Sequence, residues 1–430
     1  MKDKIKQLLI WRLEASTRKF FKAHPDVRLI VVAGSVGKTS TKLAIAQMLA
    51  QKYRIHVHKD NHNMELSVPL SIMKIPYPSN PRSLLQWIAV LVAAHKRPQQ
   101  PFPFDIIVTE LGTDRPGDIA KFGRYLQADV AVVTAVSAEH MESFGNLTAV
   151  AEEELSVAKF AKLLVINRDD IDGQFAQMLE DGRNIDTYGV GGTAEYHFLP
   201  ETGAADGYMQ GTLVTPEHGS QHVKLQVIGE HSLKSIVAAA LIGIKFGLTA
   251  DEVRRGVEAI EPVPGRMQLL RGIEGGVIID DTYNSSPLAA LAALQTLYTM
   301  PNQHRIAILG SMNELGPYSR QAHEEIGNAC DPSLLDIVVT IGEEAEDYLA
   351  PAAAARGCQV RCFRSPYDAG AFVRSIIEPK TAILAKGSQN GVFAEEAIKI
   401  LLHTPGDDAR LVRQSADWLK IKQDMFSKIG

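Results

Sequence analysis

The chain has 430 residues, of which 45% are hydrophobic and 22% are charged, as is ordinary for a globular protein of two or three domains. Its formal net charge of −5 creates no global field that would attract nucleic acid, so we expect no nucleic-acid partner. The three cysteines lack the paired spacing of a metal site, which favours reduced thiols.

Two apolar segments near the N-terminus bear on membrane contact. Residues 1–24 mix basic and apolar side chains, which predicts an amphipathic helix. Such a helix could touch a membrane surface, but packing on the next domain is the favoured interpretation. Residues 84–94 are apolar over about 11 positions, whereas a bilayer span needs about 20, so we expect a buried helix there. No secretory signal is evident, and we expect a cytoplasmic monomer without stable membrane insertion.

A glycine-rich turn between a β-type run and a helical run is the strongest signal in the chain. Residues 27–32 are strand-like, the loop contains Gly37-Lys38-Thr39, and an apolar helical face follows. Backbone N–H groups at such a helix start face an anion, Lys38 reaches the β- and γ-phosphates, and the Thr39 hydroxyl can ligate Mg²⁺. The glycines lie closer together than in the general motif, so this is a shortened P-loop. The expected nucleotide-binding residues here are Gly34, Ser35, Val36, Gly37, Lys38, Thr39 and Ser40.

Strand-like and helical runs alternate along the rest of the chain. Strands are predicted at 27–33, 105–110, 130–135, 162–167, 277–281, 305–310, 336–341 and 381–385. Helices are predicted at 40–51, 146–161, 231–247, 250–260, 286–299, 319–329 and 391–402. This alternation predicts an α/β fold with mostly parallel sheets. Residues 185–228 are richer in Gly and Thr and predict a small antiparallel β patch, and residues 262–265 are the best linker candidate.

Two predicted strands end in side chains suited to a metal. Glu110 stands at the end of one strand, and His140 follows the next. Ligands of α/β proteins bind at the carboxyl ends of parallel strands, and a carboxylate beside a P-loop is a natural Mg²⁺ ligand. Taken alone, Glu110 could equally be a surface residue, and His140 is more often a satisfied loop histidine.

Three further clusters follow the linker. Arg266 lies just after it, where a second domain could bring it to a γ-phosphate. The sequence Asp280-Asp-Thr-Tyr-Asn-Ser-Ser-Pro287 connects a strand to a helix, and Lys386-Gly-Ser388 follows another strand. Each cluster alone is a weak signal, since such turns are commonly solvated loops.

Together and in order, these segments resemble the Mur ligases, ATP-dependent amide ligases of peptidoglycan precursor synthesis. The chain is most similar to the branch that joins D-Ala-D-Ala to UDP-MurNAc-tripeptide. The matching segments are 34–41, 61–70, 110–119, 140–145, 280–287, 309–323 and 386–388. The resemblance covers roughly residues 27–402.

The resemblance implies a central P-loop ATPase-type domain with a mostly parallel sheet, followed by a Rossmann-like α/β domain. We expect an N-terminal amphipathic helix at 1–24, the central ATP-binding domain at 25–264, the C-terminal ligase domain at 265–405 and a helical tail at 406–430. In that tail, Leu411, Trp418 and Leu419 are apolar and could dock a helix.

The resemblance also implies ATP and Mg²⁺ as cofactors, with a UDP-muramyl peptide and the D-Ala-D-Ala dipeptide as substrates. The γ-phosphate would pass to the substrate carboxylate, and the amine would attack the acyl phosphate. Lys38, Arg266 and two Mg²⁺ ions would offset the charge between the anions. The expected metal-site residues are Thr39, Glu110, His140 and Glu154. The expected catalytic residues are Lys38, His140, Glu154 and Arg266, and His231, Arg266, Asp281 and Asn284 are expected to contact the nucleotide.

Three features depart from the family pattern. About 30 residues precede the P-loop, fewer than the roughly 70 that a uridine-nucleotide domain would need, so we expect the usual N-terminal UDP-binding domain to be absent. Glu154 stands where the family carries a carbamylated lysine, and we hypothesise that its carboxylate replaces the carbamate. Alternatively, Lys159 is the modified residue, although it would point elsewhere on the helix. The segment after Gly229 keeps His231 but has serine at both positions where the family has asparagine.

Two alternatives stay open from the sequence. One is a ligase of the same chemistry with a different acyl acceptor or amine. The other is a nucleotide-binding subunit that needs a partner for activity. Lys38, Glu110, His140 and Arg266 are all present, which argues against the second.

Overall fold

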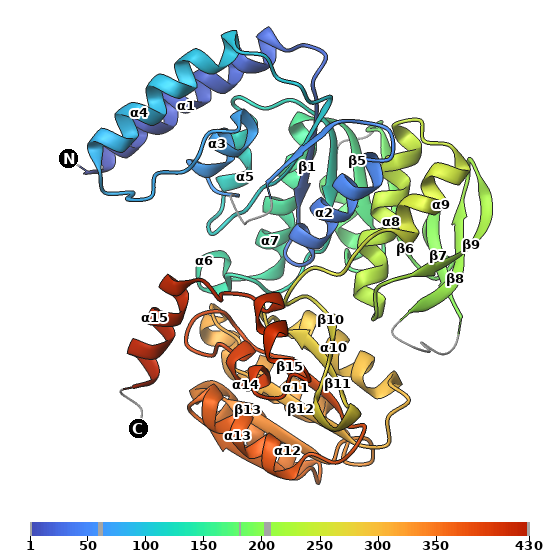
Figure 1. The fold of residues 1–430 in the computed structure, drawn as a ribbon. Helices are drawn as coiled ribbons and strands as arrows, with labels where there is room; N and C mark the ends of the chain where they lie inside the picture. Colours follow the sequence, from blue (N-terminus) through green and yellow to red (C-terminus); the bar gives the residue numbers. More distant parts are fainter. Residues whose placement is uncertain (1, 59–62, 180–181, 202–207, 428–430) are drawn as a thin grey trace.

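The chain folds around two sheets, one after the other in the sequence (Figure 1). The computed structural model describes residues 2–58, 63–179, 182–201 and 208–427. The linker predicted at 262–265 lies between the last strand of the first sheet and the first strand of the second. No helix in these ranges is long and apolar enough to cross a bilayer.

The first sheet has nine strands within the described ranges, in the order β2-β3-β1-β4-β5-β6-β7-β8-β9. All pairs from β2 to β7 are parallel, and β7-β8-β9 form an antiparallel edge. The strands are β1 Arg28–Ala33, β2 Ile55–Val57, β3 Ile106–Glu110, β4 Ala128–Val133, β5 Ala161–Asn167, β6 Ile185–Val190, β7 Tyr196–Pro200, β8 Met209–Thr215 and β9 Gly219–Leu225. The predicted β patch is therefore an extension of the main sheet, and its first strand, β6, is parallel to its neighbours.

Helices cover both faces of this sheet because alternate residues of its central strand point to opposite sides. Leu29 and Val31 of β1 join one core, and Ile30 and Val32 join the other. The first core is covered by α1 Lys2–Ala23, α3 Ser67–Met73, α4 Leu84–Lys96, α5 Asp118–Phe122, α6 Met141–Phe144 and α7 Leu147–Leu155. The second core is covered by α2 Lys38–Leu49, α8 Glu230–Lys245 and α9 Ala250–Glu258.

The second sheet has six strands among the described residues, in the order β10-β11-β15-β12-β13-β14, and is parallel except for β10. Its strands are β10 Gln268–Arg271, β11 Val277–Asp281, β12 Arg305–Gly310, β13 Ile337–Ile341, β14 Val360–Phe363 and β15 Ala382–Lys386. Its helices are α10 Pro287–Thr299, α11 Ser319–Ala329, α12 Ala350–Ala355, α13 Pro366–Ile376, α14 Glu395–Lys399 and α15 Ala416–Phe426. Here too, separate cores lie on the two faces.

Short 3₁₀ or π turns connect several of these elements. They are η1 Arg97–Gln99, η2 Ser156–Phe160, η3 Gly173–Met178, η4 Ile273–Gly275, η5 Gly316–Tyr318, η6 Ala345–Leu349 and η7 Pro405–Arg410. One of them, η2, ends the helix predicted at 146–161 early, because α7 stops at Leu155.

The structure confirms the predicted α/β fold and corrects three local predictions. The short strands β2, β10 and β14 were not predicted, because three to four residues give too little periodicity to read. The helix at 84–94 forms but is not buried, since Leu84, Leu85 and Ile88 are exposed. In the tail, Leu411 is buried, but Leu419 is exposed, and α15 docks instead through Lys422 and Phe426.

Candidate active site

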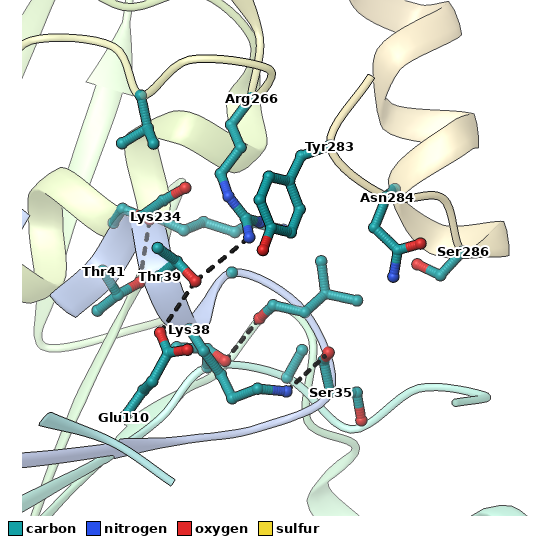
Figure 2. A pocket seen from close by; sticks show the side chains of 18 of the residues that line it. Ser35, Lys38, Thr39, Thr41, Glu110, Lys234, Arg266, Tyr283, Asn284 and Ser286 are labelled. Atoms are coloured by element: carbon teal, nitrogen blue, oxygen red, sulfur yellow. Dashed lines mark hydrogen bonds between the residues drawn. The ribbon is translucent and has the colours of Figure 1, made fainter. Parts of the chain in front are cut away.

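The two sheets face each other across a cavity of about 470 Å³. Its lining includes residues at the carboxyl ends of the strands, among them Glu110 of β3, Asp281 of β11 and Lys386 of β15. This is where open α/β sheets bind their ligands. Polar side chains converge there from β3, the P-loop, the linker and the loop after β11 (Figure 2).

The P-loop takes its tight shape from two glycines with positive φ. Gly34 has a φ of +119°, and a Cβ there would lie 2.3 Å from the Thr134 hydroxyl oxygen. Gly37 has a φ of +87° and forms the N-cap of α2. Only glycine reaches these φ values without strain, so the loop can turn sharply and leave its N–H groups at the helix start. Residues 34–40 therefore form the tight turn at the start of α2 in which the sequence predicts an anion cradle.

Lys38 folds back over this loop. Its ammonium group donates to the Gly34 carbonyl at 2.5 Å and the Ser35 carbonyl at 3.2 Å, and lies 3.7 Å from the Glu139 carboxylate. Burial works to lower the pKa of Lys38, but the carboxylates of Glu139, Glu154 and Glu110 outweigh it and raise the pKa above its ordinary value. Lys38 thus enters the cavity as a firmly charged cation.

Thr39 and Glu110 form the centre of the polar network. The Thr39 hydroxyl donates to Glu110 Oε2 at 2.9 Å and accepts from Arg266 Nη2 at 3.2 Å (Figure 2). Lys42, one turn further along α2, lies 3.3 Å from the same Glu110 oxygen, and both side chains are buried. The other oxygen, Glu110 Oε1, is buried without a hydrogen-bond partner among the described residues.

This pair fits a magnesium ion. An unpaired buried carboxylate oxygen is costly unless a cation or donor satisfies it, and a hydroxyl plus one carboxylate is a usual protein contribution to nucleotide-bound Mg²⁺. The described residues contain no cluster of three or more carboxylate, imidazole or thiol groups able to hold a metal alone. Thr39 and Glu110 would therefore hold the ion together with ligand phosphates.

Arg266 reaches the P-loop from the start of the second domain. Its guanidinium lies 4.1 Å from the centre of the Tyr283 ring and donates to Thr39, while its Nε is buried without a partner among the described residues. The Tyr283 N–H in turn donates to the Gly265 carbonyl at 2.9 Å. The Tyr283 ring thus holds Arg266 beside the P-loop, and the Nε–H of Arg266 is available to donate to a ligand.

The loop after β11 is held by buried ion pairs. Asp281 accepts from Lys386 at 2.6 Å, and Lys386 also donates to the Asn284 carbonyl at 2.9 Å. On the other side, Arg413 of the C-terminal tail donates to the carbonyls of Thr282 and Tyr283. Asp281 is thus committed to a lysine, whereas the Asn284 side chain lines the cavity (Figure 2).

The tail is fixed by a second buried charge network. Arg413 pairs with Glu395 at 2.7 Å, and Lys422 donates to Glu396 at 2.7 Å and lies 2.8 Å from Glu395. Lys422 and Glu395 are fully buried. The apolar residues of the tail predicted that a helix could dock here, but they did not predict this charge network.

His140 lies at the domain interface. Its Nδ1 is 3.3 Å from Glu314 of the second domain, and its Nε2 is 3.7 Å from Asp114 and 3.8 Å from Glu139. Nearby, Tyr318 donates its hydroxyl to the Gly145 carbonyl at 3.0 Å. His140 therefore lines the cavity among carboxylates, and no described contact joins it to Thr39 or Glu110.

Glu154 lies behind the P-loop. Its Oε2 accepts from the Gly34 N–H at 2.7 Å, and burial raises the pKa of this carboxyl to about 7 although the Lys38 charge works against the rise. Lys159, the alternative modified residue, lies in η2 and is exposed. The structure thus places Glu154, and not Lys159, beside the nucleotide loop.

The helix start expected to contact the nucleotide is partly described. His231 lies in α8, but its side chain falls outside the described part of the structure, as do Asn61 and His62 of the family-like segment 61–70. The Ser235 hydroxyl shares a 3.0 Å hydrogen bond with Thr41 of α2, and Lys234 pairs with Asp170 at 2.8 Å.

The structure therefore gathers most of the predicted residues around one cavity. Sequence reasoning assigned no role to several side chains that line it, among them Glu139, Tyr283 and Lys386, nor to Lys42, which pairs with Glu110. Tyr283 and Lys386 stood within segments that were singled out, so their position after a strand was the available signal. No feature of the sequence marked Lys42, because a lysine in the first turns of a helix is usually solvated.

Two protein-family models match the chain. The Mur ligase middle domain matches residues 32–243, and the Mur ligase glutamate ligase domain matches residues 265–389. The chain is 27% identical over 321 residues to UDP-N-acetylmuramoyl-tripeptide–D-alanyl-D-alanine ligase of Escherichia coli, a match that covers 74% of this chain and 65% of that protein. It is 26% identical to the Bacillus subtilis ligase of the same name, with 88% of this chain and 76% of that one covered.

A solved structure shares the fold. The MurF ligase from Thermotoga maritima, in complex with ADP, matches with a TM-score of 0.75 and 23% identity, over 91% of this chain and 83% of that one. The chain thus spans about two thirds of the length of the Escherichia coli relative and more of the others.

Proposed function

This chain belongs to the Mur ligase family, and we propose that it is an ATP-dependent, ADP-forming amide ligase of peptidoglycan precursor synthesis. The observation that carries the proposal is the arrangement of Lys38, Thr39, Glu110 and Arg266 around one cavity between the two sheets. We propose that it adds D-Ala-D-Ala to a UDP-MurNAc-tripeptide in the cytoplasm, the reaction in the names of the relatives from Escherichia coli and Bacillus subtilis.

The P-loop binds the nucleotide phosphates. N–H groups of the loop at the start of α2 face the phosphates, and Lys38 supplies a charge that burial does not remove. Arg266 approaches from the opposite side, so the γ-phosphate lies between two cations contributed by the two domains. His231 and Asn284 complete the nucleotide contacts. Asp281 acts indirectly, because it holds Lys386, which in turn donates to the Asn284 carbonyl.

Thr39 and Glu110 hold Mg²⁺, which, when bound, offsets the negative charge on the transferring phosphoryl group. The orphaned Glu110 Oε1 is the observation that supports this assignment. The assignment of His140 to a metal-binding role is also part of the proposal, and rests on its place in the same cavity.

The reaction proceeds by two transfers. A carboxylate oxygen of the acyl substrate attacks the γ-phosphorus, the bond to ADP breaks, and an acyl phosphate forms. The amine of D-Ala-D-Ala then attacks the acyl carbon, and the tetrahedral intermediate expels phosphate to leave the amide. Lys38 and Arg266 act in the first transfer because both anions must approach each other there.

We propose that Glu154 supplies a permanent carboxylate where relatives carry a carbamylated lysine. The support is its buried position against Gly34, with Lys38 the nearest cation acting on it. Glu154→Gln keeps the shape and removes the charge, and we expect phosphate release to fall by tenfold or more. Lys159→Gln is the matched control and should leave the rate unchanged, because Lys159 is exposed. Parent-like turnover of Glu154→Gln would remove Glu154 from the mechanism.

The test of the whole proposal is phosphate release from ATP and Mg²⁺, with and without UDP-MurNAc-tripeptide and D-Ala-D-Ala. Mass spectrometry of the product accompanies it. We expect release that requires both substrates and a pentapeptide product. Turnover only with another acyl acceptor or amine would change the substrates but keep the ligase chemistry. ATP binding without any turnover of the purified chain would favour a subunit that needs a partner.

A further inference from the structure

The two helices α1 and α4 leave an apolar surface exposed. They lie side by side at one end of the first domain, away from the second (Figure 1). Arg97, just after α4, stacks on Phe20 near the end of α1, and His24 bonds the Gln100 carbonyl. Because their carboxyl ends meet, the helices run parallel and their amino-terminal halves lie together.

Each helix uses one face for the core and leaves another bare. Leu9, Leu13 and Phe20 of α1 and Trp87, Val90 and Ala94 of α4 belong to the first core. The uncovered apolar side chains are Ile5, Leu8 and Trp11 of α1 and Leu84, Leu85, Ile88 and Val92 of α4. We call these seven residues the α1–α4 face. Leu85 is 79% exposed and Trp11 is 54% exposed, so most of each side chain is accessible to solvent or to a partner.

The composition of α4 is unusual for a surface helix. Of its 13 residues, only Gln86, His95 and Lys96 are polar, so the helix is apolar all round while only one side is buried. A surface helix of a globular protein normally carries polar residues on its outer side. An apolar outer face of this kind marks a site of interaction.

The charges around the face point to the kind of partner. Residues 1–23 contain seven Lys or Arg against two Asp or Glu, and residues 66–104 contain four Lys or Arg and no acidic residue. The whole chain has 45 basic and 50 acidic residues, so the remainder is strongly acidic. On α1, Lys4, Arg12 and Lys19 are exposed alongside the apolar residues. The two segments that contain α1 and α4 thus carry net charges of +5 (seven basic, two acidic) and +4 (four basic, none acidic), whereas the rest of the chain is acidic.

We propose that the α1–α4 face docks on an anionic lipid surface. Basic side chains bring such helices to negatively charged headgroups, and apolar side chains then enter the interface, where a tryptophan ring is well placed. The face lies on the surface and does not insert across it, since no described helix could span a bilayer. The proposal is independent of the ligase reaction, and it places the enzyme beside a membrane whichever substrates it uses.

The test is co-sedimentation of the full chain with vesicles of equal parts phosphatidylglycerol and phosphatidylcholine, compared with vesicles of phosphatidylcholine alone. We expect binding to the anionic vesicles only, weakened as ionic strength rises. Leu85→Glu/Ile88→Glu should lower the partition coefficient by tenfold or more. Leu199→Glu/Leu419→Glu, which adds the same two charges at exposed leucines of β7 and α15, is the control and should bind as the parent does.

A second measurement does not depend on the double variant. The fluorescence of Trp11 should shift to the blue on anionic vesicles, and Trp11→Phe should abolish the shift, because Trp87 is already buried and Trp418 lies on α15, where it packs against Phe393. Failure of the parent to bind anionic vesicles, or equal binding of the double variant, would overturn the proposal. So would sedimentation analysis showing a dimer that the double variant dissociates, because a second copy would then cover the face.

Discussion

The two sides of the cavity handle charge in different ways. On the P-loop side, Lys38 donates to two loop carbonyls and has only the partly exposed Glu139 carboxylate, at 3.7 Å, as an ion-pair partner, and Glu110 keeps one buried oxygen without a partner among the described residues. On the side of the second sheet, Lys386, Arg413 and Lys422 are each committed to a buried carboxylate. The P-loop side therefore has charged groups available to bind a ligand, whereas the cations on the side of the second sheet are already paired with carboxylates. This difference supports the proposal that the P-loop side binds the phosphates, and that the side of the second sheet is a framework that positions Arg266 and the loop after β11.

The largest effect should come from removing the available charge. Lys38→Met keeps the length and apolar volume of the side chain, and we expect phosphate release to fall by about 10³-fold, because a preorganised cation in a water-poor site is lost. Stability should change less than turnover, because Glu154, the buried carboxyl on which the Lys38 charge acts, keeps its hydrogen bond from the Gly34 N–H and can take up a proton. Steady-state phosphate release and thermal unfolding measure the two outcomes. Lys162→Met is the matched control, because Lys162 is an exposed surface ion-pair partner. A Lys38 variant that retains parental turnover would contradict the comparison.

On the framework side, the same replacement should act in the opposite way. Lys422→Met removes the shorter of the two ion pairs of buried Glu396 and leaves only Lys399 at 3.9 Å, and we expect the free energy of unfolding to fall by about 3 kcal/mol. Denaturant unfolding measures it, with exposed Lys420→Met as the control. Turnover of the remaining folded protein should drop far less than in the Lys38 variant. Unchanged stability would show that the tail network is not the framework inferred here.

The smallest effect is a pH dependence at the one strongly perturbed carboxyl described on β11. Burial raises the pKa of Asp280 from 3.8 to about 6, although hydrogen bonds from Thr282 oppose the rise. The folded state therefore holds a proton that the unfolded state has released between these pH values, so stability falls as pH rises from about 4 to 6. The difference corresponds to at most roughly 3 kcal/mol.

Asp280→Asn mimics the protonated carboxyl and should remove this dependence. The variant should match the parent near pH 4 and be more stable above pH 6, as measured by denaturant unfolding across that range. Parallel stability curves for the two proteins would mean that Asp280 does not carry the shift. Such a result would place Asp280 with the other buried carboxylates of the second domain, which are charged and paired with cations.

The sequence alone determined the order of the elements and the location of the nucleotide loop. Most of the longer parallel strands and several helices were predicted to within a few residues, because their side-chain pattern shows a clear period, but α13 (Pro366–Ile376) was not predicted. Gly34 and Gly37 were predictable for a similar reason, since only glycine adopts their backbone angles freely. The cavity residues Glu110, Arg266 and Asp281 were found because each follows a strand or the linker.

Tertiary structure decided which charged side chains are paired and which helix faces remain exposed to solvent. Asp281 pairs with Lys386, buried Lys422 pairs with Glu396, and Glu154 accepts from the Gly34 N–H. In each of these contacts the two residues lie more than 20 positions apart in the chain. The apolar run at 84–94 reads as a buried helix, yet half of its surface is exposed because the neighbouring elements cover only one side. Periodicity reports which face a helix could bury, and only the packed neighbours decide how much of it is covered.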